Sequence, residues 1–171
     1  MVTAEEIIRM LHLEPLDREG GMFLQTYKSA ELIEGAALPE RYRRVPHSFC
    51  TAIYYLLTDE PDSFSALHQL PTDEIYHFYL GDPVEMLLLY PDGQTRKVLF
   101  GHDILHGQRV QFVAPEGAWQ GSHLLSGGKF ALLGTTMAPG YEDNDFSIGK
   151  RDDLIGMYPG ETELIRSMTR E

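Results

Sequence analysis

The sequence predicts a mainly β protein, an antiparallel sandwich or barrel with short helices at its two ends. After the breaker Gly20-Gly21 the hydrophobic period changes from helical to extended, and short apolar runs recur between turn residues up to about residue 140. Helical periodicity returns only after residue 150. Many short strands joined by tight turns are typical of antiparallel sheets that pack face to face or close into a barrel.

The two chain ends carry the helical signals. Thr3 and Glu6 form a capping box, in which each side chain accepts a hydrogen bond from a backbone N–H of the first turn. An apolar stripe follows this box and predicts an amphipathic helix over about 3–12. The tail over about 151–169 predicts two short helices that pack on the outside of the barrel. Its apolar positions are Leu154, Ile155, Leu164, Ile165 and Met168.

Between the helices the chain predicts one barrel over about 20–140. The expected strands lie near residues 22–28, 49–58, 63–69, 73–80, 83–90, 94–100, 109–114, 119–125 and 129–138. The turns between them have clear chemistry, because Pro91-Asp92-Gly93 combines the fixed φ of proline with the positive φ of glycine. The segment 31–39 has no such pattern and predicts an irregular loop, either a lid or an interface arm. We expect residues 1–171 to form one domain.

Composition limits the partners. Asp and Glu number 26 against 14 Lys and Arg, a net charge of −12 that repels phosphate backbones and anionic lipid. We therefore expect neither nucleic acid nor a membrane as a partner, and no run approaches the roughly 18 apolar residues of a membrane span. The single cysteine, Cys50, excludes an intrachain disulfide. With no signal-like N-terminal segment, these features predict a cytoplasmic protein.

Two motifs in order resemble those of the cupin superfamily. The first, residues 68–81, has His68, Glu74 and Gly81 in the expected places, but Leu70 replaces the second histidine of the usual pattern. The second, residues 115–120, has the proline and the glycine, but Gln120 replaces its histidine. Further stretches along nearly the whole chain resemble a branch of RmlC-like jelly-roll proteins without a settled function. The resemblance implies a double-stranded β-helix barrel with a pocket in its lumen.

Strand geometry selects the candidate residues. Alternate side chains of a strand share one face, so that Glu74, Tyr76 and Phe78 point the same way. The resemblance places Glu74 in the lumen, and His68 with it. We predict His68 as a catalytic base, Glu74 as its orienting partner and Tyr76 as an acid. The expected ligand-binding residues are Gln120, Trp119, Gln25, Tyr27 and Phe78. An alternative is that His68 and Glu74 are a purely structural buried pair.

The motif substitutions disfavour a metal or other cofactor. An uncharged glutamine amide is a poor ligand for zinc or iron(II), and His68 with Glu74 supplies fewer than the three protein ligands usual in a catalytic site. A bulge that turned His77 or His123 inward would restore a ligand. A metal-dependent cupin with atypical ligands therefore stays open as an alternative.

The sequence predicts a small-molecule-binding cupin. The enzyme class that it favours is a metal-independent isomerase or epimerase that acts on a carbohydrate-like or carbonyl substrate. A non-catalytic sensor that keeps the pocket is the main alternative. The cluster Arg41, Arg43 and Arg44 is either an anion clamp or a solvated loop that balances nearby glutamates, and we favour the solvated loop. We also expect a homodimer, as in similar cupins, with the strand after Gly21 as its exchanged edge.

Overall fold

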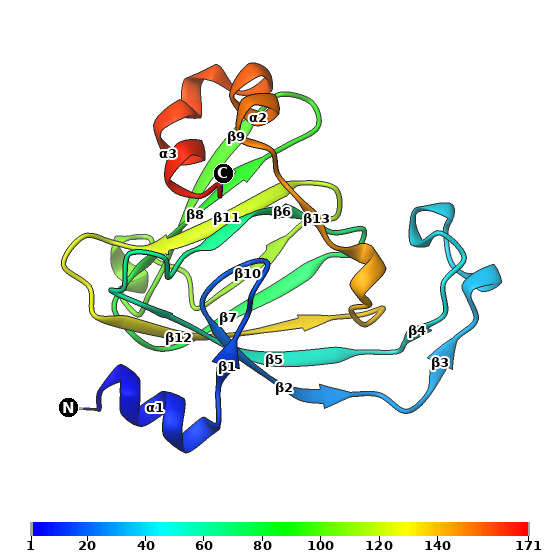
Figure 1. Ribbon diagram of the computed structural model, residues 1–171, viewed down its shortest axis with the longest axis horizontal. Coiled ribbons are helices and arrows are strands. Elements are labelled where there is room, and N and C mark those ends of the chain that lie inside the picture. The colour runs from blue at the N-terminus through cyan, green and yellow to red at the C-terminus, as the bar shows by residue number, and fades with distance from the viewer. Residues whose placement is uncertain (1, 171) are drawn as a thin grey trace.

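The computed structural model describes residues 2–170, which form two packed antiparallel sheets and a small two-stranded ribbon (Figure 1). One sheet has the order β1-β2-β5-β12-β7-β10, the other β13-β6-β11-β8-β9, and the ribbon is β3-β4. The strands are β1 Glu14–Pro15, β2 Met22–Lys28, β3 Leu32–Ile33, β4 His47–Ser48, β5 Thr51–Thr58, β6 Ser65–Gln69, β7 Glu74–Gly81, β8 Val84–Leu89, β9 Thr95–Phe100, β10 Gln111–Ala114, β11 Trp119–Leu124, β12 Phe130–Met137 and β13 Ser147–Ile148.

All nine predicted strands are present; the one predicted at 22–28 has the same bounds as β2, and no end of the others differs by more than two residues from the expected one. Four two-residue strands, β1, β3, β4 and β13, were not expected, because a pair of residues carries no measurable hydrophobic period. The predicted irregular loop at 31–39 contains β3 and a turn of 3-10 helix, Gly35–Ala37. The β3-β4 ribbon projects away from the two sheets (Figure 1).

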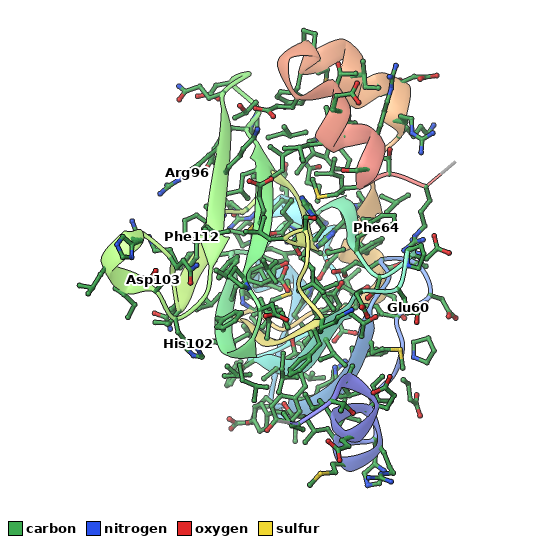
Figure 2. The ribbon with its side chains drawn as sticks, turned by 90° about the vertical axis from the view of Figure 1, so that its left-hand side faces the viewer. Glu60, Phe64, Arg96, His102, Asp103 and Phe112 are labelled. Atoms are coloured by element: carbon green, nitrogen blue, oxygen red, sulfur yellow. The ribbon has the colours of Figure 1, made fainter. Side chains whose placement is uncertain are left out.

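The main core lies between the two sheets. It is built from inward-facing side chains of β5, β7, β8, β9 and β12, and its larger members include Tyr55, Phe78, Met86, Phe100 and Leu133. Burial of such side chains is the dominant stabilising term in a sandwich. The loop with His102 and Asp103 stands off the barrel on the side opposite Phe64 (Figure 2).

Helices cover the outer faces of both sheets. Helix α1 (Ala4–Leu11) begins at the predicted capping box, with Thr3 as its N-cap, and packs Ile7 against Leu56 and Leu132 of the six-stranded sheet. Helices α2 (Arg151–Met157) and α3 (Thr162–Ser167) lie over the five-stranded sheet (Figure 1). Within residues 2–170, none of the helices has the length and apolar character needed to cross a membrane.

A tight turn before β2 and a bulge within it determine which side chains face the barrel interior. The hairpin before it turns at Gly20 and Gly21, whose φ angles are 103° and 72°, and a Cβ at Gly20 would collide with the backbone oxygen of Phe64. Glycine is required at both positions. Further along β2, the pairing with β5 shifts between Gln25 and Tyr27, so Thr26 is an inserted bulge residue.

We predict that Leu154 is one of the main anchors of the C-terminal helices. Leu154 of α2 is 1% exposed and packs in a cluster with Leu67, Leu87 and Leu89 of the sheet below. Leu154→Ala should lower the free energy of unfolding by about 2–4 kcal/mol, measured by urea denaturation. Met157→Ala on the same helix, where Met157 is 54% exposed, should change it by less than about 0.5 kcal/mol. Equal effects of the two variants would contradict this packing.

Candidate functional site

A cavity of about 650 Å³ opens between the two sheets, a volume suited to a small organic molecule. Its wall combines apolar side chains with charged ones from four separate parts of the chain, residues 17–19, 28, 74 and 142–143. The lining residues are Pro15, Leu16, Asp17, Arg18, Glu19, Phe23, Gln25, Lys28, Thr51, Ala52, Ile53, His68, Leu70, Glu74, Thr135, Met137, Tyr141, Glu142, Asp143 and Phe146.

His68 is held firmly at the wall of this cavity by β6. Its side chain is 1% exposed, and the ring of Phe146 stacks on the imidazole with 5.1 Å between centroids. Nδ1 lies 2.8 Å from the backbone oxygen of Ala66, an acceptor, so Nδ1 carries a proton. The other ring nitrogen, Nε2, is therefore the atom that can exchange a proton with a ligand.

Glu74 begins β7 and lies next to His68. The shortest distance between the Glu74 carboxylate and His68 Nε2 is 3.9 Å, from Oε2. That same oxygen accepts hydrogen bonds from the Tyr76 hydroxyl at 3.0 Å and from the Gln120 amide at 2.6 Å. Tyr76 and Gln120 thus fix the orientation of this carboxylate.

A second carboxylate, that of Glu19, reaches the same imidazole from the hairpin before β2. Its Oε2 lies 4.0 Å from His68 Nε2, while Oε1 accepts a hydrogen bond from the Ser65 hydroxyl at 2.7 Å. His68 is thus placed between two carboxylates that are 55 residues apart in the chain.

The charges of this cluster shift the pKa values of its members. Burial disfavours the imidazolium, but the negative charges of Glu19 and Glu74 outweigh burial and raise the pKa of His68 to about 9. Burial raises the pKa of Glu19, although the His68 charge and the Ser65 hydrogen bond oppose it. For Glu74 burial acts in the same direction, but His68 and the hydrogen bonds prevail and lower its pKa.

The amide of Gln120 bridges His68 and Glu74. Its –NH₂ group donates to Glu74 Oε2 at 2.6 Å and lies 3.1 Å from His68 Nε2, which can accept a hydrogen bond only when that nitrogen carries no proton. Donation to the imidazole favours the neutral ring. This contact therefore lowers the pKa of His68, whereas the two carboxylates raise it. Gln120 Oε1 is buried and has no hydrogen-bond partner within residues 2–170.

The structure brings some of the sequence-predicted residues together. His68, Glu74 and Gln120 form the cluster just described, and Gln25 lines the cavity. Tyr76 and Phe78 face the barrel interior as predicted, but they belong to the packed core and do not line the cavity. Burial raises the pKa of Tyr76 well above its usual range, and its proton is held by Glu74, which argues against the expected acid role.

Two of the expected ligand-binding residues lie elsewhere. Trp119 is next to the inward-facing Gln120 in β11, so it points to the outer face and packs under the C-terminal helices. Tyr27 was expected to share a face with Gln25, but the bulge at Thr26 turns it outward, where it is 54% exposed. Neither residue is part of the cavity wall.

Sequence reasoning missed the cavity residues that come from outside the barrel strands. These are the hairpin residues from Asp17 to Glu19 and the segment from Tyr141 to Phe146. The run Glu19-Gly20-Gly21 was a usable signal, because a carboxylate before two glycines marks a tight turn with a polar tip. The second segment carried no comparable signal, and contacts such as the 2.7 Å ion pair of Lys28 with Glu142 place it against β2.

Two residues of the arginine cluster, Arg41 and Arg43, line a separate, smaller cavity of about 290 Å³. Arg41 forms an ion pair of 2.6 Å with Glu116 and donates to the backbone oxygen of Pro71. Arg43 donates to the backbone oxygen of Asn144 at 3.4 Å. Arg41 is thus neutralised by a partner that the sequence analysis did not name, and neither arginine lines the main cavity.

The residues at the metal position of a cupin do not suit a metal. Leu70 has no donor atom, and the Gln120 amide directs its –NH₂ group toward the two residues that would be ligands. Within residues 2–170, no three His, Cys, Asp or Glu side chains are arranged as a ligand set. His77 and His123 point to outer faces, since they neighbour inward-facing residues and contact Gln111 and Glu85 respectively.

A double-stranded jelly roll with a polar cluster in its lumen defines the cupin class, and comparison with known proteins gives the family. Residues 5–149 match the model of the family described as Cupin superfamily (DUF985), and the chain belongs to this family. An uncharacterised protein of Saccharomyces cerevisiae is 32% identical over 148 residues, which cover 81% of this chain and 71% of that protein.

Solved structures of similar proteins agree with this fold. A hypothetical protein from Leishmania major superposes with a TM-score of 0.87 at 29% identity, over 99% of this chain and 100% of that one. A protein from Shewanella oneidensis superposes with a TM-score of 0.83 at 29% identity, over 99% of both chains. A dTDP sugar isomerase from Desulfovibrio desulfuricans, with a TM-score of 0.51 at 13% identity over 63% of this chain and 68% of that one, shares the fold alone.

The raised pKa of His68 predicts a pH dependence of stability. The native pKa of about 9 exceeds the ordinary value of 6.5, so the native state holds this proton more tightly than the unfolded chain. The resulting stabilisation is complete below pH 6.5 and is lost as the pH rises through 9. At full extent it is about 3 kcal/mol. Urea unfolding of the wild type should therefore weaken between these pH values.

Two variants identify the group responsible. His68→Gln should lack the loss of stability between pH 6.5 and 9, and Glu19→Gln should reduce it, because one of the two attracting charges is gone. A wild type and a His68→Gln variant with parallel pH profiles would show that the buried imidazole is neutral at pH 7.

Proposed function

We propose that this protein is a metal-independent cupin isomerase or epimerase, which transfers a proton next to the carbonyl group of a small carbohydrate-like or other carbonyl substrate. His68 is the central proton-transfer residue and Glu74 orients it. The observation that carries the proposal is the position of His68 Nε2, at a cavity wall and about 4 Å from two carboxylates. Titratable groups with opposed environments in one cavity are typical of acid–base sites.

The charge of the cluster decides the order of the steps. With a pKa of about 9, His68 is protonated at neutral pH before the substrate arrives. We therefore infer that it first donates its Nε2 proton to the carbonyl oxygen and acts as a base afterwards, when it takes the proton back. The sequence alone favoured a base, because it did not place a second carboxylate beside the ring.

The cavity favours substrates without a phosphate group. Five of its lining residues are acidic, against two basic ones and the protonated His68. One basic residue, Lys28, is already paired with Glu142, and the guanidinium of Arg18 lies over the ring of Phe146. A wall of this sign repels phosphate and attracts neutral or cationic molecules. Unphosphorylated aldoses and ketoses are accordingly the first substrates to test.

A non-catalytic binding role is the second candidate. The observation that favours it is the Gln120 amide, which is directed at His68 Nε2 and occupies the atom that catalysis needs. In this case the cavity would still bind a small molecule, and substitutions at His68 would alter its affinity without a reaction to lose.

The His68→Gln variant tests the catalytic role. We expect it to lower the exchange of the proton next to the carbonyl by about a hundredfold or more, because acid–base residues contribute 10²–10⁴-fold. The measurement is ¹H NMR in D₂O with a panel of unphosphorylated aldoses and ketoses, in which the signal of that proton disappears as deuterium replaces it.

His106→Gln is the matched control, because His106 is exposed in the loop away from the cavity and should leave the rate unchanged. Dialysis against EDTA should also leave it unchanged. A rate restored only by an added divalent metal would overturn the metal-independent mechanism. Sugar binding in the wild type without exchange would favour the non-catalytic role.

We also propose that the protein forms a homodimer. Strand β1 pairs only with Met22 and Phe23 of β2, and the rest of β2 presents an exposed edge toward Lys28. An open strand edge is a template for pairing with a second copy. Sedimentation velocity at micromolar concentration should give about twice the mass of the chain, and Gln25→Pro should shift the species toward the monomer. A monomeric wild type would contradict the proposal.

A further inference from the structure

The two carboxylates beside His68 differ in their hydrogen bonds and in their exposure. Glu74 Oε2, the oxygen nearest the imidazole, already accepts hydrogen bonds from Tyr76 and Gln120. Glu19 Oε1 accepts one from Ser65, but within residues 2–170 no hydrogen bond is made to its Oε2, which lies 4.0 Å from His68 Nε2. The Glu19 side chain is also more exposed, 16% against 9% for Glu74. An unoccupied oxygen at a cavity wall is available to a ligand.

The hairpin that carries Glu19 is held in place by the other end of the chain. The backbone oxygen of Glu19 accepts a hydrogen bond from the N–H of Ala66 at 2.8 Å and lies 3.5 Å from the Arg170 guanidinium. That guanidinium also covers the ring of Phe64, 4.3 Å from its centroid, on the side shown at the right of Figure 2. The Tyr55 hydroxyl donates to the next backbone oxygen, that of Gly20, at 3.0 Å.

Backbone contacts of this kind are typical of a side chain that is held in place for a function. A carboxylate on a flexible loop would turn toward water, because ionised groups are costly to bury. Here the backbone on which Glu19 stands is fixed by β6, by the core residue Tyr55 and by Arg170, and the side chain is directed toward His68. Preorganisation of this kind is what proton transfer at a carbon requires.

We propose that Glu19 is the catalytic base of this site, and that it takes the proton from the carbon next to the carbonyl while His68 protonates the carbonyl oxygen. The inference rests on the proposed isomerase function. The C–H electron pair becomes the C=C bond of an enediol, and the carbonyl π electrons receive the His68 proton. On return, neutral His68 takes the proton of the neighbouring hydroxyl and Glu19 delivers its own proton to the former carbonyl carbon.

This assignment selects one reaction type. A single carboxylate removes and returns the proton on one face of the enediol, which moves the carbonyl to the neighbouring carbon. Inversion at the same carbon would need a second base on the opposite face. Glu74 is poorly suited to that task, because its hydrogen bonds and the nearby His68 lower its pKa and leave its inner oxygen occupied. The site therefore corresponds to an aldose–ketose isomerase and not to an epimerase.

The experiment compares Glu19→Gln, Glu19→Asp and the control Glu14→Gln, all in the same N-terminal segment. Glu19→Gln keeps an oxygen for the Ser65 hydroxyl but cannot accept a proton, and we expect it to lower exchange into the same sugar panel by about a hundredfold or more. Glu14, exposed in β1 and outside the cavity wall, should tolerate the change with a rate within twofold. Glu19→Asp should retain part of the rate with a shifted acid limb of the pH–rate profile.

The outcomes separate this inference from the proposed function. If the wild type exchanges the proton of no sugar in the panel, the isomerase proposal fails, and the role of Glu19 with it. If exchange depends on His68 but Glu19→Gln keeps more than half of the rate, only the inference on Glu19 fails. An unshifted acid limb in Glu19→Asp, with both proteins folded by circular dichroism, would assign Glu19 a structural role and overturn the inference.

Discussion

The burial of an imidazole between two carboxylates is the constraint on which the rest of this structure depends. His68, Glu19 and Glu74 are removed from bulk water, and ionised groups are stable in such a place only when they are paired and hydrogen-bonded. Several strands supply hydrogen-bond donors to these groups. Ser65 contacts Glu19, and Tyr76 contacts Glu74, so each carboxylate has a donor from the barrel itself.

Much of the barrel follows from local patterns. The alternation in β7 correctly places Glu74, Tyr76 and Phe78 inside, since the strand period of two leaves no other choice once one residue is assigned. The same rule, applied strictly, excludes Trp119 as a neighbour of Gln120 on the inner face. Tyr27 could not be placed in this way, because the bulge at Thr26 reverses the alternation and leaves no mark in a single sequence.

The site itself was only half predictable. The cupin motifs locate His68 and Gln120 on the paired strands β6 and β11, and Glu74 on β7 of the other sheet, where its carboxylate meets the Gln120 amide. Glu19 belongs to a hairpin whose path depends on long-range contacts with Tyr55 and Arg170. No periodicity within the hairpin encodes those contacts. The glycines at positions 20 and 21 indicate a turn, but the direction in which the turn points is a property of the assembled fold.

The same substitutions that make a cupin metal site unsuitable here create a different electrostatic arrangement. A histidine at position 120 would bring a second imidazole toward the carboxylates, whereas the amide of Gln120 brings donors and an oxygen without any charge of its own. A proton on His68 offsets part of the negative charge that Glu19 and Glu74 bring to the pocket. In the function proposed above, this proton is the one that His68 transfers to the carbonyl oxygen of the substrate. Leu70, which stands where the usual motif has its second histidine, lines the same cavity with an apolar side chain, and charge interactions are stronger in less polar surroundings.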